Sequence, residues 1–350
     1  MPQKPSKQGF EALREEAQGP WAVRTLGRVG ALGIGPRVRR TYQRWHERTR
    51  LRRYEQGNAG AREAFQRNRP TLTPTQERLV RRLGSHGIAS AGIRDLLGAD
   101  AWWTTLSAAA DRWLASDDVL AREREWLGQR AREIAGAAKR KLGKGYLIRM
   151  FGRDAPMAWD SPWLRFAVEP AVLDVANAYL ALFSKIIYVD VWNTVPLTHD
   201  GPDVASQRWH RDPEDRRLLK VFLYLRDVPS GAGPLQYVPR SRPGEQYGDF
   251  WPQQFPAGSV PPEGAVEAGI PEGDREVCAY PAGTLVFVDT VGLHRGGRAD
   301  EERRVVATWT YTTHASLWAR AFALDRTAVP DDLTDAARFA LLSPDDPPGR

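Results

Sequence analysis

The spacing of apolar residues along the chain changes its period near residue 143. Before that point apolar residues recur every three or four positions, which is typical of amphipathic helices. The pattern predicts a helix that begins after Thr73, where Pro74 and Gln76 complete a capping signal, and further helices over residues 90–97 and between residues 100 and 141. Residues 162–184 form a later apolar stretch that predicts one more helix.

Short apolar runs separated by Pro, Gly and Asp predict strands after residue 143. The predicted strands cover residues 145–151, 185–192, 207–212, 218–225, 233–238, 276–280, 284–289 and 304–312. Helices come first and strands afterwards, without regular alternation, so the expected fold class is mainly β with flanking helices (α+β). About eight antiparallel strands at this spacing suit a jelly roll.

Composition limits the setting in which the chain works. An apolar content of 42% supplies a sizeable core. The sequence contains no run of 18 apolar residues, so no transmembrane helix is expected. The N-terminus is polar and lacks an apolar signal core. The single cysteine, Cys278, excludes an internal disulfide and a thiolate zinc cluster. These features predict a cytoplasmic protein.

Positive charge is concentrated at the N-terminus. Residues 1–53 hold 13 Lys and Arg against 4 Asp and Glu, so in a chain of net charge +7 the remainder is slightly negative. Such a segment is typical of a solvated helix, or of one that meets an acidic partner or an anionic surface. Nucleic acid is the less favoured partner, because aromatic residues for base stacking are sparse there.

The predicted organisation has three parts. Residues 1–100 form a basic, mostly helical N-terminal region, residues 101–330 form the β domain with its flanking helices, and residues 331–350 form a C-terminal tail. The stretch 240–276 is rich in Pro and Gly, contains several aromatic residues and shows no clear secondary structure. A segment of this length and composition is predicted to be a functional lid.

Candidate chemistry begins with His210 and Asp212. Two positions apart on a predicted strand, their side chains share a face, and a second histidine would complete the two-histidine, one-carboxylate facial site of non-haem iron enzymes. One such pair is weak support among six His and 43 acidic residues, since a surface His followed by a strand-ending Asp gives the same pattern.

Further candidates lie downstream. His294 follows the predicted strand 284–289 by five residues and is a candidate third ligand at the end of the sheet. Arg304 begins the next strand, and its guanidinium fork suits a bidentate carboxylate, although the adjacent Arg303 is an alternative. Lys220 either pairs with a carboxylate or lies at a surface strand edge.

These pieces together resemble a known family. Trp209-His-Arg-Asp212, the strand that begins at Lys220, Gly233-Pro-Leu-Gln-Tyr-Val-Pro239, Pro281-Ala-Gly-Thr-Leu285, His294, and Arg304 with Tyr311 are similar to the phytanoyl-CoA dioxygenase family of iron(II)/2-oxoglutarate-dependent oxygenases. The similarity covers roughly residues 145–315. One difference is the charged loop between His294 and Arg304, where the family has a polar, Asn-containing loop.

The resemblance implies a double-stranded β-helix (jelly roll, cupin-like). It implies His210, Asp212 and His294 as catalytic iron(II) ligands and Arg304 as the residue that binds 2-oxoglutarate, and we assign Lys220 to the cofactor site with it. The implied cofactors are Fe(II), 2-oxoglutarate and molecular oxygen.

The implied reaction is hydroxylation of a small-molecule or lipid-like substrate. Relatives that halogenate instead carry a small residue in place of the carboxylate, so Asp212 favours hydroxylation. Two alternatives stay open: an inert barrel that acts as a binding or scaffold protein, and a nucleic-acid-modifying oxygenase.

Overall fold

The computed structural model describes residues 51–52, 54–135, 145–196, 203, 205–252 and 260–342. Most of the predicted basic segment, residues 1–50, lies outside this range. Thr73 caps its helix as predicted: its hydroxyl accepts from the Gln76 backbone N–H, and the Gln76 side chain accepts from the Thr73 backbone N–H. The elements of this part are α4 (Ala59–Arg67), α5 (Pro74–His86), β1 (Ile88–Gly92), α6 (Ile93–Leu97), α7 (Ala101–Leu114) and α8 (Asp117–Ile134).

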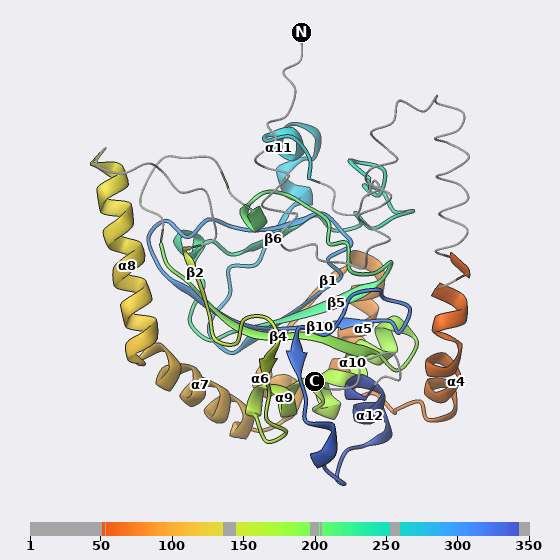
Figure 1. Cartoon of the computed structure of the whole chain (residues 1–350). Helices are drawn as coiled ribbons and strands as arrows, with labels where there is room; N and C mark the ends of the chain where they lie inside the picture. The colour runs from red at the N-terminus through yellow and green to blue at the C-terminus, as the bar shows by residue number, and fades with distance from the viewer. Residues whose placement is uncertain are drawn as a thin grey trace, which may run out of the picture.

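A six-stranded antiparallel sheet forms the centre of the molecule. Its strand order is β1-β8-β5-β10-β4-β2, with β8 at Thr284–Val288, β5 at Leu218–Tyr224, β10 at Arg304–Thr312, β4 at Lys185–Thr194 and β2 at Leu147–Arg149. A three-stranded antiparallel sheet of β7 (Glu276–Val277), β6 (Leu235–Tyr237) and β9 (His294–Gly296) lies across from it (Figure 1). Mainly antiparallel sheets with flanking helices confirm the predicted fold class.

Helices cover the face of the large sheet that points away from the small sheet (Figure 1). They include α9 (Pro162–Ala167), α10 (Pro170–Leu180) and α12 (Asp335–Leu341). Val305, Ala307 and Trp309 of β10 pack in the core on this outer face, where Trp309 Nε1 donates to the Trp163 carbonyl at 2.8 Å. Val306 belongs instead to an inner cluster that contains Leu235 and Tyr237 of the small sheet. The inner face of the large sheet is therefore the one that looks toward the small sheet.

Segments on both sides of the predicted boundaries at residues 100 and 330 contribute to one core. Leu83 from α5 and Leu341 from α12 belong to the same buried cluster on the outer face of the large sheet. The edge strand β1 pairs with β8 over its whole length. The predicted division of the chain stays a prediction, and helices from both sides of its boundaries pack in one cluster on the outer face of the sheet.

The helix predicted over residues 90–97 is wrong in its first part. Residues 88–92 form the edge strand β1, in which Ser90 pairs with Val286, and only Ile93–Leu97 is helical. Ile93, Leu96 and Leu97 do lie on a helix, as their spacing predicted. Residues 88–92 instead pair with β8, because the backbone N–H and C=O groups at the edge of that strand need hydrogen-bond partners.

The helix predicted over residues 162–184 is two helices. Pro170 begins α10 at its first position, and α9 ends at Ala167. Proline lacks a backbone N–H and its ring clashes with the preceding turn, so a helix that reaches it must stop and restart. The end of α10 at Leu180 is followed by Ala181 in a left-handed conformation (φ 59°).

Residues 207–212 do not form the predicted strand. Ala205–Gln207 is a 3-10 turn (η1), and the following residues make only an isolated bridge, between His210 and His294.

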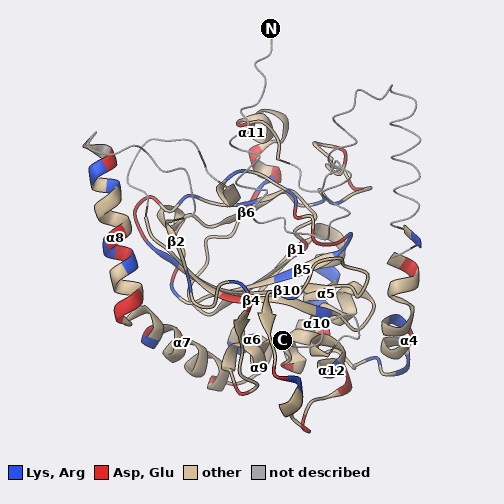
Figure 2. Ribbon diagram, viewed as in Figure 1, with Lys and Arg blue, Asp and Glu red and all other residues tan. Residues whose placement is uncertain are grey.

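Charged side chains are spread over the described part of the molecule, and α8 carries both Arg and Asp or Glu along its length (Figure 2). Within the described residues, no helix combines the length and apolarity needed to span a membrane.

Candidate metal centre

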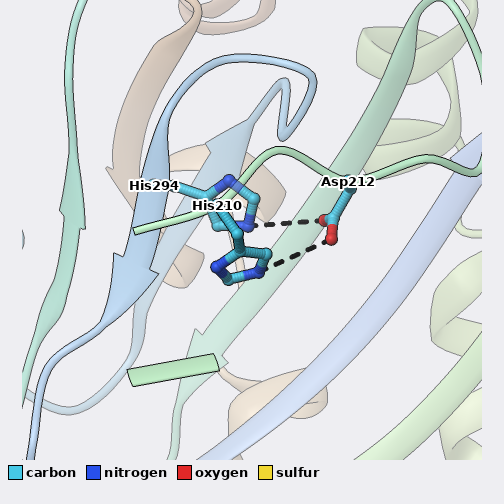
Figure 3. Close-up of side chains that lie close together, drawn as sticks. All are labelled: His210, Asp212 and His294. Atoms are coloured by element: carbon cyan, nitrogen blue, oxygen red, sulfur yellow. Dashed lines mark ion pairs between the residues drawn. The ribbon is translucent and has the colours of Figure 1, made fainter. Parts of the chain in front are cut away.

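His210, Asp212 and His294 converge between the two sheets (Figure 3). His210 Nε2 lies 3.6 Å from Asp212 Oδ1, and His294 Nε2 lies 3.4 Å from Asp212 Oδ2. One potential ligand atom from each of the three residues lies within 4.8 Å of the others. Ligand bonds to a transition metal are about 2 Å long, so this separation suits three ligands of one ion.

Backbone hydrogen bonds place the two histidines beside each other although they are 84 positions apart in sequence. The His210 N–H donates to the His294 carbonyl at 2.9 Å, and the His294 N–H donates back to His210 at 3.0 Å. The Asp212 N–H donates to the Thr290 carbonyl at 2.9 Å, which fixes the carboxylate two residues further on. The shared face predicted for His210 and Asp212 therefore arises from pairing with the 290–294 segment.

Gly292 allows the close approach of this segment to the small sheet. A Cβ atom at this position would lie 2.1 Å from the Tyr237 hydroxyl, which is far below contact distance. Its carbonyl also accepts a hydrogen bond from His294 Nδ1 at 3.0 Å. In the same way His210 Nδ1 donates to the Arg208 carbonyl at 2.8 Å. With Nδ1 protonated by these contacts, Nε2 of each ring keeps its lone pair for a metal.

Electrostatics keep His210 and Asp212 in metal-binding protonation states. Burial, reinforced by the neighbouring His294, lowers the pKa of His210 to about 3, so this imidazole is neutral at pH 7. Burial acts to raise the pKa of Asp212, but the Lys220 ammonium and the two imidazoles hold it well below its ordinary value. A neutral imidazole and a carboxylate are the forms that bind a cation.

Lys220 is a partly buried partner of the metal centre. It lies on β5, an internal strand of the large sheet, so the alternative of a surface lysine at a strand edge is wrong. Its Nζ lies 2.7 Å from Asp212 Oδ2 and 3.2 Å from Glu214 Oε1. Burial acts to lower the pKa of Lys220, but the two carboxylates raise it above its ordinary value. Its place in a cofactor site stays a prediction.

Arg304 points between the sheets, and Arg303 points away from them. Arg303 forms an ion pair with Glu123 of α8 at 2.9 Å, and its side chain is 49% exposed. Arg304 Nη1 donates to the Gly297 carbonyl at 3.3 Å, and a Cβ atom on Gly296 would lie 3.3 Å from its Nη2. Burial lowers the pKa of Arg304. The guanidinium therefore lies beside the strand that begins with His294.

The positions of Tyr311 and Thr194 were not expected from the sequence. Tyr311 belongs to the outer core and donates to the Ala167 carbonyl at 2.7 Å, so it takes no part in the site. Thr194 pairs with Arg304 across the sheet, and its buried Oγ1 has no hydrogen-bond partner among the described residues. Nothing in the sequence marks Thr194, because its position opposite Arg304 depends on the strand register.

Arg211 lies between the two candidate ligands His210 and Asp212. It is a second residue whose contribution the sequence analysis did not predict. Its side chain is among the largest that are fully buried. Burial lowers its pKa to about 10. Its guanidinium donates to six backbone carbonyls, those of Ser241, Tyr247, Gly248, Phe250, Trp251 and Val291. One side chain thus fastens residues 241–251 to the backbone that carries the ligands.

We expect Arg211→Met to lower the free energy of unfolding by about 3 kcal/mol or more, because it leaves several buried carbonyls without donors. Urea unfolding of the metal-free protein measures this. Arg226→Met is the control: Arg226 is half exposed and pairs with an exposed Asp111, so its loss should cost less than about 1 kcal/mol. Equal effects of the two changes would contradict this role for Arg211.

Two residues just before His210 also contact the predicted lid, residues 240–276. Arg208 donates to the Pro261 carbonyl at 3.3 Å, and Trp209 Nε1 donates to Glu267 of α11 (Ala265–Gly269) at 2.8 Å. Residues 253–259 lie outside the described residues, so the function of this segment as a lid stays a prediction. His314 Nε2 donates to the Phe183 carbonyl at 3.1 Å, and its ring packs on Phe339 of α12.

Comparisons with known proteins give similarities only at the level of structure. No protein-family model matches the chain, and a search of curated proteins gives no match. Similar solved structures include the epimerase SnoN in complex with Fe3+, alpha ketoglutarate and nogalamycin RO, at 18% identity and a TM-score of 0.41, over 68% of this chain and 83% of SnoN.

Two further structures are similar to a comparable extent. EctD from S. alaskensis, solved with 2-oxoglutarate and 5-hydroxyectoine, has 16% identity and a TM-score of 0.43 over 69% of this chain and 76% of its own. HygX from Streptomyces hygroscopicus, solved with nickel and 2-oxoglutarate, has 14% identity and a TM-score of 0.36 over 69% of this chain and 87% of its own.

Proposed function

We propose that the protein is a non-haem iron(II)/2-oxoglutarate-dependent dioxygenase that hydroxylates a small-molecule substrate, built on a double-stranded β-helix (jelly roll). The observation that carries this proposal is the set of two imidazoles and one carboxylate within 4.8 Å, with the Arg304 guanidinium beside the same strand, β9. Two His and one carboxylate leave open positions on iron, as this class of oxygenase requires.

His210, Asp212 and His294 would hold the metal. Lys220 would position Asp212, because its ammonium contacts the carboxylate oxygen Oδ2 directly. When bound, iron and 2-oxoglutarate supply the chemistry in which oxygen converts 2-oxoglutarate to succinate and carbon dioxide and a substrate C–H bond to C–OH. A carboxylate ligand at position 212 supports hydroxylation over the insertion of a halide.

Arg304 and Thr194 would bind the distal carboxylate of 2-oxoglutarate. Among the described residues, the only hydrogen bond from the Arg304 guanidinium goes to the Gly297 carbonyl, so most of its donors are available. The unpartnered Thr194 hydroxyl on the neighbouring strand supplies a further donor. A guanidinium fork matches a carboxylate in shape and charge.

Several finer assignments rest on this proposal. Membership of the phytanoyl-CoA dioxygenase family, a lipid-like substrate and a cytoplasmic location stay predictions. An acidic partner or anionic surface for the N-terminal segment is also a prediction, since residues 1–50 lie outside the described range. A nucleic-acid substrate receives no support from any contact described above.

One observation favours an inert binding barrel as the second candidate. Lys220 Nζ lies 2.7 Å from Asp212 Oδ2, so an ammonium already neutralises the carboxylate that a metal needs. The same ion pair is also compatible with a lysine that only orients a metal-binding carboxylate. The dioxygenase and the inert barrel are expected to differ in metal affinity and in turnover.

Succinate formation from 2-oxoglutarate separates the two candidates. The full chain with Fe(II), ascorbate and oxygen is expected to produce succinate slowly without substrate, and not at all when zinc replaces iron. Stoichiometric iron binding without succinate, across a broad set of small molecules, would support the inert barrel and contradict the proposal.

A further inference from the structure

Arg149 lies at the centre of a second polar cluster on the inner face of the large sheet. Its Cζ is 5.5 Å from the centre of the Tyr188 ring and 5.9 Å from that of Trp192, so the guanidinium packs on two aromatic rings. Its Nε lies 3.3 Å from Asp190 Oδ2, and its Nη2 donates to the Tyr188 hydroxyl. Arg149 comes from the edge strand β2, and the other three side chains come from β4.

Hydrogen bonds hold this cluster rigidly. The buried Asp190 carboxylate accepts from the Tyr188 hydroxyl and from the Val191 N–H, each at 2.8 Å, and from the Phe151 N–H at 3.1 Å. Trp192 Nε1 donates to the Tyr188 hydroxyl at 3.0 Å. Asp190 therefore accepts three hydrogen bonds, none of them from Arg149. Its ion pair with Arg149 orients the guanidinium, and N–H groups of the guanidinium stay available for another acceptor.

The cluster also presents unused donors. Among the described residues, Arg149 Nη1 has no hydrogen-bond acceptor, and its buried Nε makes an ion pair without a hydrogen bond. The Arg149 side chain is 33% exposed, so it is accessible from outside. Across the sheet from Tyr188 of this cluster, the Thr310 hydroxyl of β10 is buried and has no partner in the described part of the chain. Buried polar atoms without partners are rare in native proteins and require an explanation such as a ligand.

Strand register places the cluster next to the metal centre. Tyr188 pairs with Thr310, and Thr310 pairs with Lys220, whose ammonium contacts Asp212. Paired residues of antiparallel strands share a face, so all three side chains point inward. Two strand spacings separate Tyr188 from Lys220, which is about 10 Å. Tyr188 of the cluster therefore lies two strands from Lys220, on the same face of the large sheet.

We propose that Arg149, with Thr310, forms the substrate subsite and recognises a compact oxyanion, a carboxylate or a phosphate, on the substrate. The proposal rests on the proposed function and names the substrate class for the same interior. Its contacts differ from those of the candidate 2-oxoglutarate residue: Arg149 contacts Tyr188 and Asp190, whereas Arg304 donates to the Gly297 carbonyl. A preorganised guanidinium favours anions and repels cationic substrates.

Matched probes test this inference. Saturation-transfer NMR on the full chain, with zinc and saturating 2-oxoglutarate, gives Kd for benzoate, phenyl phosphate and the neutral isostere benzamide. We expect at least one anion to bind about tenfold more tightly than benzamide, since a charge-assisted bond is worth about that factor. Arg149→Gln should remove the difference, Arg149→Lys should keep part of it, and Thr310→Val should weaken the anion about threefold. The relative affinities of benzoate and phenyl phosphate tell which oxyanion the subsite prefers.

Arg303→Gln is the control, because Arg303 points outward to Glu123 and should leave every probe unchanged. Equal binding of the anions and benzamide by the wild type, or full retention of anion binding in Arg149→Gln, would overturn the proposal. So would a tenfold loss of 2-oxoglutarate affinity in Arg149→Gln, because it would place Arg149 in the cofactor site. If 2-oxoglutarate fails to bind the wild type while the Arg149-dependent preference persists, the subsite stands and the proposed function fails.

Discussion

Asp212→Ala is expected to reduce 2-oxoglutarate turnover by about a thousandfold or more. Loss of a hydrogen-bond partner of a metal ligand typically costs about 10–100-fold, so loss of the only anionic ligand should cost more. The change also leaves the Lys220 ammonium, now without Asp212, facing the metal position and repelling the cation. Succinate formation at saturating iron and 2-oxoglutarate measures the effect.

Two further variants show whether this loss comes from the ligand or from the fold. Glu63→Ala removes an exposed carboxylate on α4, outside the sheets and the predicted lid, and should leave turnover unchanged. In Asp212→Ala the Lys220 ammonium keeps only Glu214 as its partner among the described residues, and in the Asp212→Ala/Lys220→Met double variant this cation beside the metal position is absent, so part of the metal affinity should recover. Turnover above a tenth of the wild-type value in a well-folded Asp212→Ala protein would remove Asp212 from the site.

Arg304→Ala is expected to raise the concentration of 2-oxoglutarate needed for half-saturation well over tenfold. A charge-assisted bidentate contact is worth roughly 1.5–3 kcal/mol, and 1.4 kcal/mol corresponds to a factor of ten. Arg303→Ala should change this concentration less than about twofold, because Arg303 pairs with Glu123 outside the sheets. Calorimetric titration of 2-oxoglutarate into the metal-loaded variants gives both values.

The reverse ranking of the two arginine variants would contradict this assignment. Thr194→Val adds a finer check: it removes the unpartnered hydroxyl while keeping the volume, and should weaken 2-oxoglutarate a few-fold. No change in Thr194→Val combined with a large change in Arg304→Ala would leave Arg304 as the single carboxylate contact.

The sequence was sufficient to predict the fold class and to nominate the three converging side chains. His210 and Asp212 share a local spacing, and His294 follows an apolar strand, so each can be recognised from its neighbours in sequence. The sequence favoured Arg304 over Arg303 through its spacing from His294 and Tyr311, while the apolar alternation of β10 did not decide which side chain points inward, because either face can be apolar. Only the outer helices decide it, since they bury Trp309 and so turn Arg304 inward.

Contacts that depend on register could not be predicted. Lys220 meets Asp212, and Thr194 lies opposite Arg304, because of pairings between strands far apart in the chain. Arg211 is similar: its six carbonyl acceptors come from residues 30 or more positions away, and an arginine inside a polar motif suggests a surface residue. The segment 207–212 was predicted as a strand, but it forms a single bridge to His294 of β9 in place of a strand ladder, and this pairing cannot be recognised from local sequence.

Anaerobic titration of Fe(II) and then 2-oxoglutarate into the full chain, followed by visible absorption, tests the central claim most directly. We expect a weak charge-transfer band that requires both additions, saturates at about one iron per chain, and disappears in Asp212→Ala. Arg304→Ala should show the band only at much higher 2-oxoglutarate. A folded wild type that binds iron without developing the band, or a band that persists unchanged in Asp212→Ala, would contradict the assignment of this site.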